Sequence, residues 1–177
     1  MREEGGRAFV HVWQQGERTI TFTWIGPSDV LADRVYGFAF TPEGTMLLVS
    51  DAGGEYWLPG GGVEAGETAA AALARELREE AAASLTACEK LGTQLAENEK
   101  GEQSYQAFYW CRITLAEKFL PQFEISERKL VEPHTFLDEL FWGRHDPKAE
   151  MLLERALGIE KARLNQALTL TTTENSA

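Results

Sequence analysis

The sequence predicts an α/β domain in which a mixed β-sheet is covered by helices on both faces. Strand-like segments stand before and after one central helical segment, and further helical segments follow the last strand. No internal repeat interrupts this order. With 177 residues, the chain has the length of one domain that buries a core and carries short extensions.

The first fifty residues contain two candidate β-hairpins. AFVHVW (8–13) and TITFTWI (19–25) alternate apolar and polar residues around a connection with a glycine, which is typical of paired strands. VYGFAF (35–40) and TMLLVS (45–50) flank the turn sequence TPEG. We therefore expect an N-terminal hairpin followed by a second hairpin.

A glycine-rich loop leads into the central helix. Residues 56–58 are expected to return briefly to the sheet before this loop ends. Thr68 is a suitable N-cap, and an alanine-rich helix follows to about Ala83 because alanine has the highest helix propensity.

The second half of the chain alternates strands and helices in a less regular way. We expect strands at 86–96, 105–115 and 129–136, a loop at 116–128, and helices within 136–143 and 147–164. The polar end should be disordered. The predicted organisation is a hairpin extension (1–30), a main domain (31–164) and a disordered tail (165–177).

The chain is acidic, with 28 Asp and Glu against 17 Lys and Arg and a net charge of −11. This charge disfavours a nucleic-acid polymer as partner and suits a protein that gathers divalent cations. Cys88 and Cys111 lack metal-ligand spacing, and buried thiols are favoured over a disulfide. Neither a signal peptide nor a membrane-spanning run is recognised, so we expect a cytoplasmic protein.

Three glutamates share one face of the central helix. Glu76, Glu79 and Glu80 have helical spacing and fall within an arc of roughly 100°. They also lie near the C-terminal end, where the helix dipole disfavours negative charge. A solvated acidic face, with Arg75 paired to Glu79, is the simpler reading. A hard divalent cation would instead turn the mutual repulsion of these carboxylates into affinity.

The residues around these glutamates favour the metal site. From Gly61 the chain reads G-x5-E-x7-R-E-L-x-E-E, which includes Glu67, Arg75, Glu76, Leu77, Glu79 and Glu80. This pattern resembles the Nudix box of the Nudix hydrolase (MutT-like pyrophosphohydrolase) family, and the resemblance extends over residues 35–158 or so. It implies a Nudix-type α/β/α sandwich with a mixed β-sheet, to which the N-terminal β-hairpin is added.

One position departs from the family pattern. Ala82 stands where the Nudix box has a glycine, which normally ends the helix in a left-handed conformation. Alanine would be strained there by about 1 kcal/mol. We therefore expect the helix to continue a turn further, through Ala83 and Ser84, with the metal ligands unaffected.

The resemblance implies roles for the box residues. The family hydrolyses a nucleoside diphosphate linked to another moiety X, by substitution at phosphorus with Mg²⁺ (or Mn²⁺) bound. By this resemblance the metal ligands are Gly60, through its carbonyl, together with Glu76, Glu79 and Glu80, and Glu67 supports them. Arg75 is expected to clamp neighbouring carboxylates.

The general base and the substrate pocket are less defined. The family draws the base from the box or from a loop before a late strand, where Glu127, with Glu124 behind it, is the candidate. Aromatic residues near the glycine loop are candidates for stacking on a nucleobase, against the alternative of core packing: Tyr36, Phe38, Tyr56, Trp57 and Trp142.

Several functions remain open. A Mg²⁺-dependent pyrophosphohydrolase competes with a non-catalytic, nucleotide-sensing Nudix module, and the complete set of box glutamates favours the enzyme. Nucleoside triphosphates compete with ADP-ribose and nucleotide sugars as the small-molecule substrate, and the charge argues against capped RNA. The aromatic residues of the N-terminal hairpin also suggest a homodimer, because an isolated hairpin must bury its apolar side.

Overall fold

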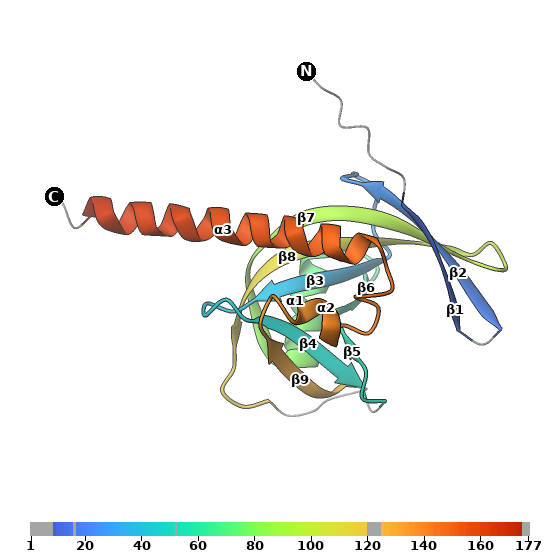
Figure 1. Cartoon of the computed structure of the whole chain (residues 1–177), viewed down its shortest axis with the longest axis horizontal. Helices are drawn as coiled ribbons and strands as arrows, with labels where there is room; N and C mark the ends of the chain where they lie inside the picture. Colours follow the sequence, from blue (N-terminus) through green and yellow to red (C-terminus); the bar gives the residue numbers. More distant parts are fainter. Residues whose placement is uncertain (1–8, 16, 52, 120–124, 175–177) are drawn as a thin grey trace, which may run out of the picture.

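The computed structural model describes residues 9–15, 17–51, 53–119 and 125–174 (Figure 1). Within this part of the chain, nine strands form one sheet. They are β1 (Val10–Gln15), β2 (Arg18–Gly26), β3 (Arg34–Phe40), β4 (Met46–Asp51), β5 (Tyr56–Trp57), β6 (Gly60–Gly62), β7 (Ala83–Asn98), β8 (Gln103–Leu115) and β9 (Ile125–Val131).

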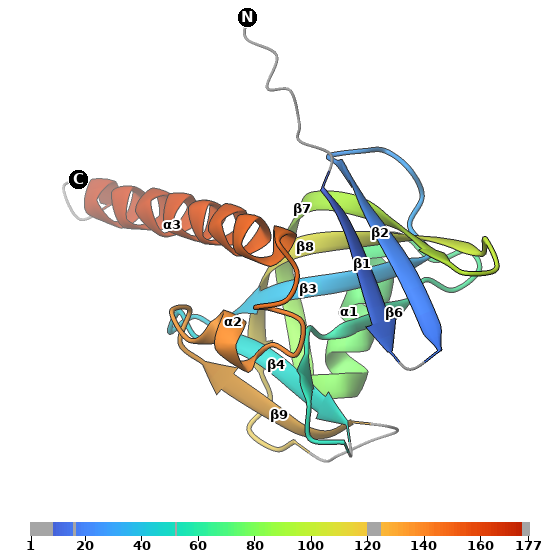
Figure 2. The same ribbon diagram turned by 45° about the vertical axis from the view of Figure 1, so that its right-hand side comes forward.

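The sheet is mixed. Its strand order is β1-β2-β7-β8-β3-β4-β5, with β6 paired to β3 and β9 paired to β4. Strands β3 and β8 run parallel, whereas pairs such as β2–β7 and β4–β9 are antiparallel. Helices cover both faces, and the α/β sandwich predicted from the sequence is confirmed (Figures 1 and 2).

Two apolar clusters fix the layers. On one face, Leu73 and Leu77 of helix α1 (Ala69–Ala81) pack with Val35 and Ile113 of the sheet. On the other face, helices α2 (Phe136–Glu139) and α3 (Lys148–Glu174) pack against β3, β4 and β8. Each strand therefore buries alternate residues on opposite faces, as its period of two requires.

Helix α1 begins as predicted and ends earlier than predicted. The Thr68 hydroxyl accepts a hydrogen bond from the Ala71 N–H at 3.2 Å, which caps the helix. The expectation that the helix continues through Ser84 is wrong, because α1 ends at Ala81 and Ala82 adopts φ 49° and ψ 42°. Strand β7 starts at Ala83, so the chain must reverse at once. Arg128 donates to the Ala81 carbonyl at 2.6 Å and helps to hold this helix end.

The N-terminal hairpin is part of the main sheet. Strand β2 pairs with β7, and Trp24 is buried in the core beside Phe108. The apolar side of the hairpin therefore packs largely on its own chain, which removes the main reason given for a homodimer. Figure 2 shows β1 and β2 crossing the end of the sheet.

Other boundaries differ in detail. Strand β7 carries two irregularities, at Leu85/Ala87 and Lys90/Gly92, and spans more than the predicted 86–96. Strand β9 starts at Ile125, inside the predicted loop. Helix α3 continues to Glu174 and so includes most of the expected disordered tail. The helix therefore extends beyond its predicted end at Leu164.

The structure also bears on two expectations from the sequence, the free cysteines and the lack of a membrane-spanning segment. Cys88 and Cys111 are register partners on β7 and β8 and are free thiols. None of the helices in the described residues has the length and apolarity to cross a membrane.

Candidate active site

Arg75 is the centre of the glutamate-rich site on α1. Its Nε and Nη2 donate to the two carboxylate oxygens of Glu67 at 3.2 and 3.1 Å. Its Nη1 donates to Glu76 at 2.8 Å and to Glu79 at 3.3 Å, and Nη2 also reaches the Gly62 carbonyl at 2.8 Å. The hydrogen bond from Arg75 lowers the pKa of Glu67. One guanidinium thus fixes three carboxylates to the glycine loop.

Glu80 lies in a different environment from the clamped glutamates. Its carboxylate accepts a hydrogen bond from the Gly60 N–H at 2.8 Å. Burial raises the pKa of Glu80 to about 8, and the nearby charges of Glu76 and Glu79 act in the same direction. The Gly60 hydrogen bond and the Arg34 charge oppose this rise without cancelling it. A cation bound beside Glu80 would favour its charged form and offset the repulsion from Glu76 and Glu79.

The glycine loop is shaped to meet these carboxylates. A Cβ on Gly60, which has φ 148°, would lie 2.0 Å from the Val35 carbonyl oxygen, so the backbone of β6 could not stay beside β3. A Cβ on Gly61 would lie 2.3 Å from a carboxylate oxygen of Glu76. Position 60 requires glycine because a side chain would collide with the backbone of β3. Position 61 requires glycine because a side chain would collide with the Glu76 carboxylate.

The box glutamates offer hard oxygen donors, the ligand type that Mg²⁺ prefers. Within the described residues, however, no three His, Cys, Asp or Glu side chains converge in a metal-binding arrangement. The hydrogen bonds explain why, because Arg75 draws Glu76 and Glu79 toward itself while Glu80 turns to Gly60. The donor set fits a divalent cation, and the carboxylates would have to turn from these partners to hold one.

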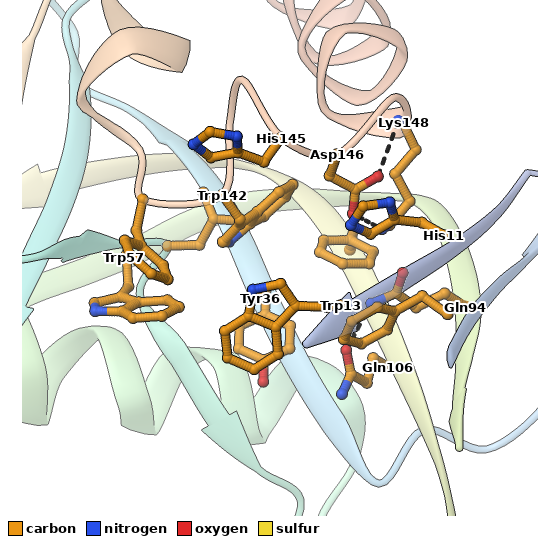
Figure 3. A pocket seen from close by; sticks show the side chains of 14 residues that line it. His11, Trp13, Tyr36, Trp57, Gln94, Gln106, Trp142, His145, Asp146 and Lys148 are labelled. Atoms are coloured by element: carbon orange, nitrogen blue, oxygen red, sulfur yellow. Dashed lines mark hydrogen bonds and ion pairs between the residues drawn. The ribbon is translucent and has the colours of Figure 1, made fainter. Parts of the chain in front are cut away.

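An aromatic pocket adjoins the glutamate site. Its volume is about 190 Å³ (Figure 3). Leu58, one of its lining residues, precedes Gly60 by two positions. Tyr36, another, accepts a hydrogen bond at 2.8 Å from Arg34, whose charge acts on Glu80. Arg34 thus connects one pocket residue, Tyr36, with the carboxylates of α1.

The structure separates the predicted substrate-binding residues into two groups. Tyr36, Trp57 and Trp142 line the pocket, and Figure 3 shows Trp57 and Trp142 on the side nearest α2. Phe38 is fully buried and packs against Phe136 with ring centroids 5.6 Å apart. Core packing, the alternative stated for Phe38, is what the structure shows. Tyr56 lies outside the pocket lining and its hydroxyl donates to Glu127.

Glu127 is not brought to the glutamate face by any contact of the described residues. It lies on β9, where its neighbour Arg128 points to α1 and bonds the Ala81 carbonyl. Strand alternation puts Glu127 on the opposite face, together with Lys129, which bonds Glu139 of α2. Its own carboxylate accepts from Tyr56 at 2.9 Å. Glu124 falls outside the described residues.

Sequence reasoning missed several pocket residues. The hairpin supplies His11, Trp13 and Phe22, and a second histidine, His145, comes from the segment that precedes α3. The other missed residues are polar and come from distant segments: Gln94, Gln106, Asp146 and Lys148. The sequence around Gln94, LGTQLA, mixes polar and apolar residues and gave no clear signal that this side chain is buried at a pocket.

Comparisons with known proteins show the family and the fold of the chain. The NUDIX domain family model matches residues 30–152. No curated protein matches the chain. The fold is similar to the Bacillus subtilis pyrophosphohydrolase BsRppH, with 20% identity, a TM-score of 0.65, and coverage of 85% of this chain and 97% of that one.

Two further solved structures share the fold at lower similarity. A NUDIX hydrolase from Nitrosomonas europaea is 15% identical, with a TM-score of 0.55 over 71% of this chain and 87% of its own. The NUDIX domain of Shewanella oneidensis NrtR, solved with ADP ribose, is 20% identical, with a TM-score of 0.55 over 72% and 90%.

The matched residues include the glycine loop, all four box glutamates and Arg75. The protein belongs to the Nudix family, as the sequence motif predicted. Its class is that of a hydrolase acting on pyrophosphate bonds. The family match starts at residue 30 and therefore leaves out the β1–β2 hairpin, although this hairpin supplies part of the pocket.

Proposed function

We propose that this protein is a Mg²⁺-dependent (or Mn²⁺-dependent) hydrolase that cleaves a nucleoside diphosphate linked to another moiety X. The observation that carries the proposal is the buried carboxyl of Glu80, crowded by Glu76 and Glu79 beside an aromatic pocket. In this proposal Glu76, Glu79, Glu80 and the Gly60 carbonyl hold the cation. When bound, the cation would neutralise the diphosphate charge and favour attack by water at phosphorus.

The protein side chains have separate tasks in this proposal. Arg75 keeps Glu67, Glu76 and Glu79 aligned, and its five hydrogen bonds to four residues leave it poorly placed to bind phosphate. The rings of Tyr36, Trp57 and Trp142 would orient the nucleobase, so that the diphosphate lies toward the carboxylates. Binding energy from the base would thereby position the reacting phosphorus.

We assign the general base to the box, with Glu79 as the candidate. Its side chain is 37% exposed, compared with 14% for Glu76, so a water molecule can approach it more readily. Glu127 is the weaker candidate, since its carboxylate bonds Tyr56 on the other face of the sheet. Glu79→Gln should abolish most turnover even at Mg²⁺ concentrations that still raise its melting temperature, which separates the base from the ligand role, while Glu127→Gln should retain turnover. The reverse result would return the role to Glu127.

The decisive experiment is a substrate panel of nucleoside triphosphates, ADP-ribose and nucleotide sugars, with phosphate release measured in Mg²⁺ and in EDTA. Hydrolysis of at least one compound that requires the metal supports the proposal. A second measurement avoids turnover altogether: Mg²⁺ should raise the melting temperature of the parent more than that of Glu80→Gln. Undiminished hydrolysis in EDTA would refute the metal requirement.

A non-catalytic sensor is the second candidate, because the similar NrtR domain was solved with ADP ribose. It would bind such a ligand with no hydrolysis in the same panel. The complete glutamate set favours the enzyme.

We also keep a homodimer as a proposal, with light scattering as its test. A monomer at tens of micromolar would end it.

A further inference from the structure

One wall of the pocket is built by the β1–β2 hairpin. His11 and Trp13 of β1 and Phe22 of β2 line the pocket. The intervening Val12 points away from it and is 52% exposed. This alternation assigns one side of β1 to the pocket and the other to solvent. Since the family match starts at residue 30, this wall is a feature that the Nudix domain alone does not provide.

A row of register partners connects the hairpin to the pocket floor. Trp24 of β2 pairs with Gln94 of β7, Gln94 pairs with Gln106 of β8, and Gln106 pairs with Arg34 of β3. Partners in one row of a sheet share a face. The two carboxamides therefore lie between the hairpin and the Arg34–Tyr36 pair, and Figure 3 shows them together at one side of the pocket.

Gln94 is the unusual member of this row. Its side chain is only 3% exposed, and its Nε2 donates to Gln106 Oε1 at 2.6 Å. Its Oε1 has no hydrogen-bond partner among the described residues. A buried carbonyl oxygen without a partner is costly, and native proteins nearly always supply one. Because Gln94 lines the pocket, a small movement of its side chain would present this buried oxygen to a ligand N–H group.

The charged residues of the pocket are already satisfied. Lys148 and Asp146 form a buried ion pair, and the Lys148 ammonium also lies over the rings of Phe22 and Trp142 at 5.1 and 5.7 Å. The contact of Lys148 with Phe22 joins the start of α3 to the hairpin. Besides His11 and His145, the polar side chains available to a ligand in this pocket include the two carboxamides, which offer an acceptor on Gln94 and a donor on Gln106.

We infer that the hairpin and the Gln94–Gln106 pair determine which nucleobase the site accepts, and that they select a base with an exocyclic amino group. This inference rests on the proposed use of the pocket for a base. A glutamine carboxamide matches the amino group and adjacent ring nitrogen of adenine, and cytosine presents a similar edge. Inosine and uridine place a carbonyl oxygen at that point, where it would face Gln94 Oε1 and leave the acceptor unsatisfied.

The test is calorimetric binding of nucleoside monophosphates to the full chain in EDTA. The probes are the pairs AMP and IMP, and CMP and UMP, whose members differ at the amino position. In at least one pair, the amino compound should bind about tenfold tighter than its partner, the lower end of what a matched base contact contributes. Equal affinities in both pairs, or tighter binding of IMP and UMP, would overturn the inference.

Two matched pairs of variants locate the effect. Gln94→Met keeps the side-chain volume and should abolish the preference, whereas Gln103→Met, on the exposed end of β8, should preserve it. Trp13→Ala should weaken binding of the amino compound about tenfold, whereas Val12→Ala on the same strand should not. Preserved preference in Gln94→Met, or equal binding by the two hairpin variants, would contradict the assignment.

These measurements separate this inference from the proposed function. Monophosphates have no diphosphate bond, and EDTA removes the cation, so base selection is read without turnover. Selective binding together with an inactive substrate panel would support the inference and refute the hydrolase. Metal-dependent hydrolysis without base preference would support the hydrolase and refute the inference. The wild-type comparison also decides the base preference if a pocket variant fails to fold.

Discussion

The glutamate site and the aromatic pocket adjoin, but the chain builds them in opposite ways. The glutamate site comes from one continuous segment, residues 60–80, in which a glycine loop returns to the helix that follows it. The pocket takes residues from β1, β2, β3, β5, β7, β8 and the segment 141–148. Charge chemistry is thus encoded locally, whereas ligand shape is encoded by the tertiary fold. This difference predicts that variants in the two regions fail differently.

The largest effect on activity is expected at the glutamate site. Glu80→Gln removes a proposed cation ligand and should lower kcat/KM at least about a hundredfold, because the cation carries the transition-state charge. Nucleoside monophosphate binding in EDTA should stay near that of the parent. The matched control is Glu154→Gln, which removes an exposed carboxylate on α3 and should leave turnover intact. Near-normal turnover in Glu80→Gln would break the assignment.

The two aromatic residues Phe38 and Trp57 should separate stability from binding. Phe38→Ala empties a fully buried position and should destabilise the protein by about 3–5 kcal/mol in chemical denaturation. Trp57→Ala removes a pocket wall that is partly exposed, so it should raise KM several-fold with a much smaller loss of stability. If both variants lose stability equally, the pocket is part of the core and the comparison fails.

The raised pKa of Glu80 predicts how stability depends on pH. Its folded-state pKa of about 8 exceeds its ordinary value of 4.5, so the folded state binds the proton more tightly than the unfolded state does. The contribution of Glu80 is therefore fully present below about pH 4.5 and is lost as pH rises through 8. In EDTA, melting temperatures of the parent should fall across this window relative to Glu80→Gln. A constant difference between the two curves would contradict the shift.

The smallest expected effect lies where α1 ends. Ala82 has φ 49°, a left-handed conformation that strains alanine and suits glycine. Ala82→Gly should therefore stabilise the protein by up to about 1 kcal/mol, with activity unchanged. Ala81→Gly is the control, since a helical position should be destabilised by glycine. A loss of stability in Ala82→Gly would show that the strain is relieved elsewhere.

The sequence predicted the features that depend on local interactions and missed those that depend on contacts between distant segments. It predicted the mixed sheet, the capped helix and the family because periodicity, Thr68 and the box spacing are local signals. It did not predict the left-handed Ala82, since the start of β7 and the contact from Arg128 force that turn from outside the helix. The sheet face on which Glu127 lies likewise depends on the pairing of β9 with β4, and its role as general base stays a prediction.

The sequence by itself determined the clustering of carboxylates, because Glu76, Glu79 and Glu80 lie on one helix whose geometry follows from the helix period. Only the tertiary structure decided which aromatic residues meet a ligand. Phe38 and Tyr36 are two positions apart on β3, yet one faces the helix-covered core and the other reaches the pocket. It also decided that Trp13 and Gln94 belong to one site, since pairing between β2 and β7 joins segments some eighty residues apart.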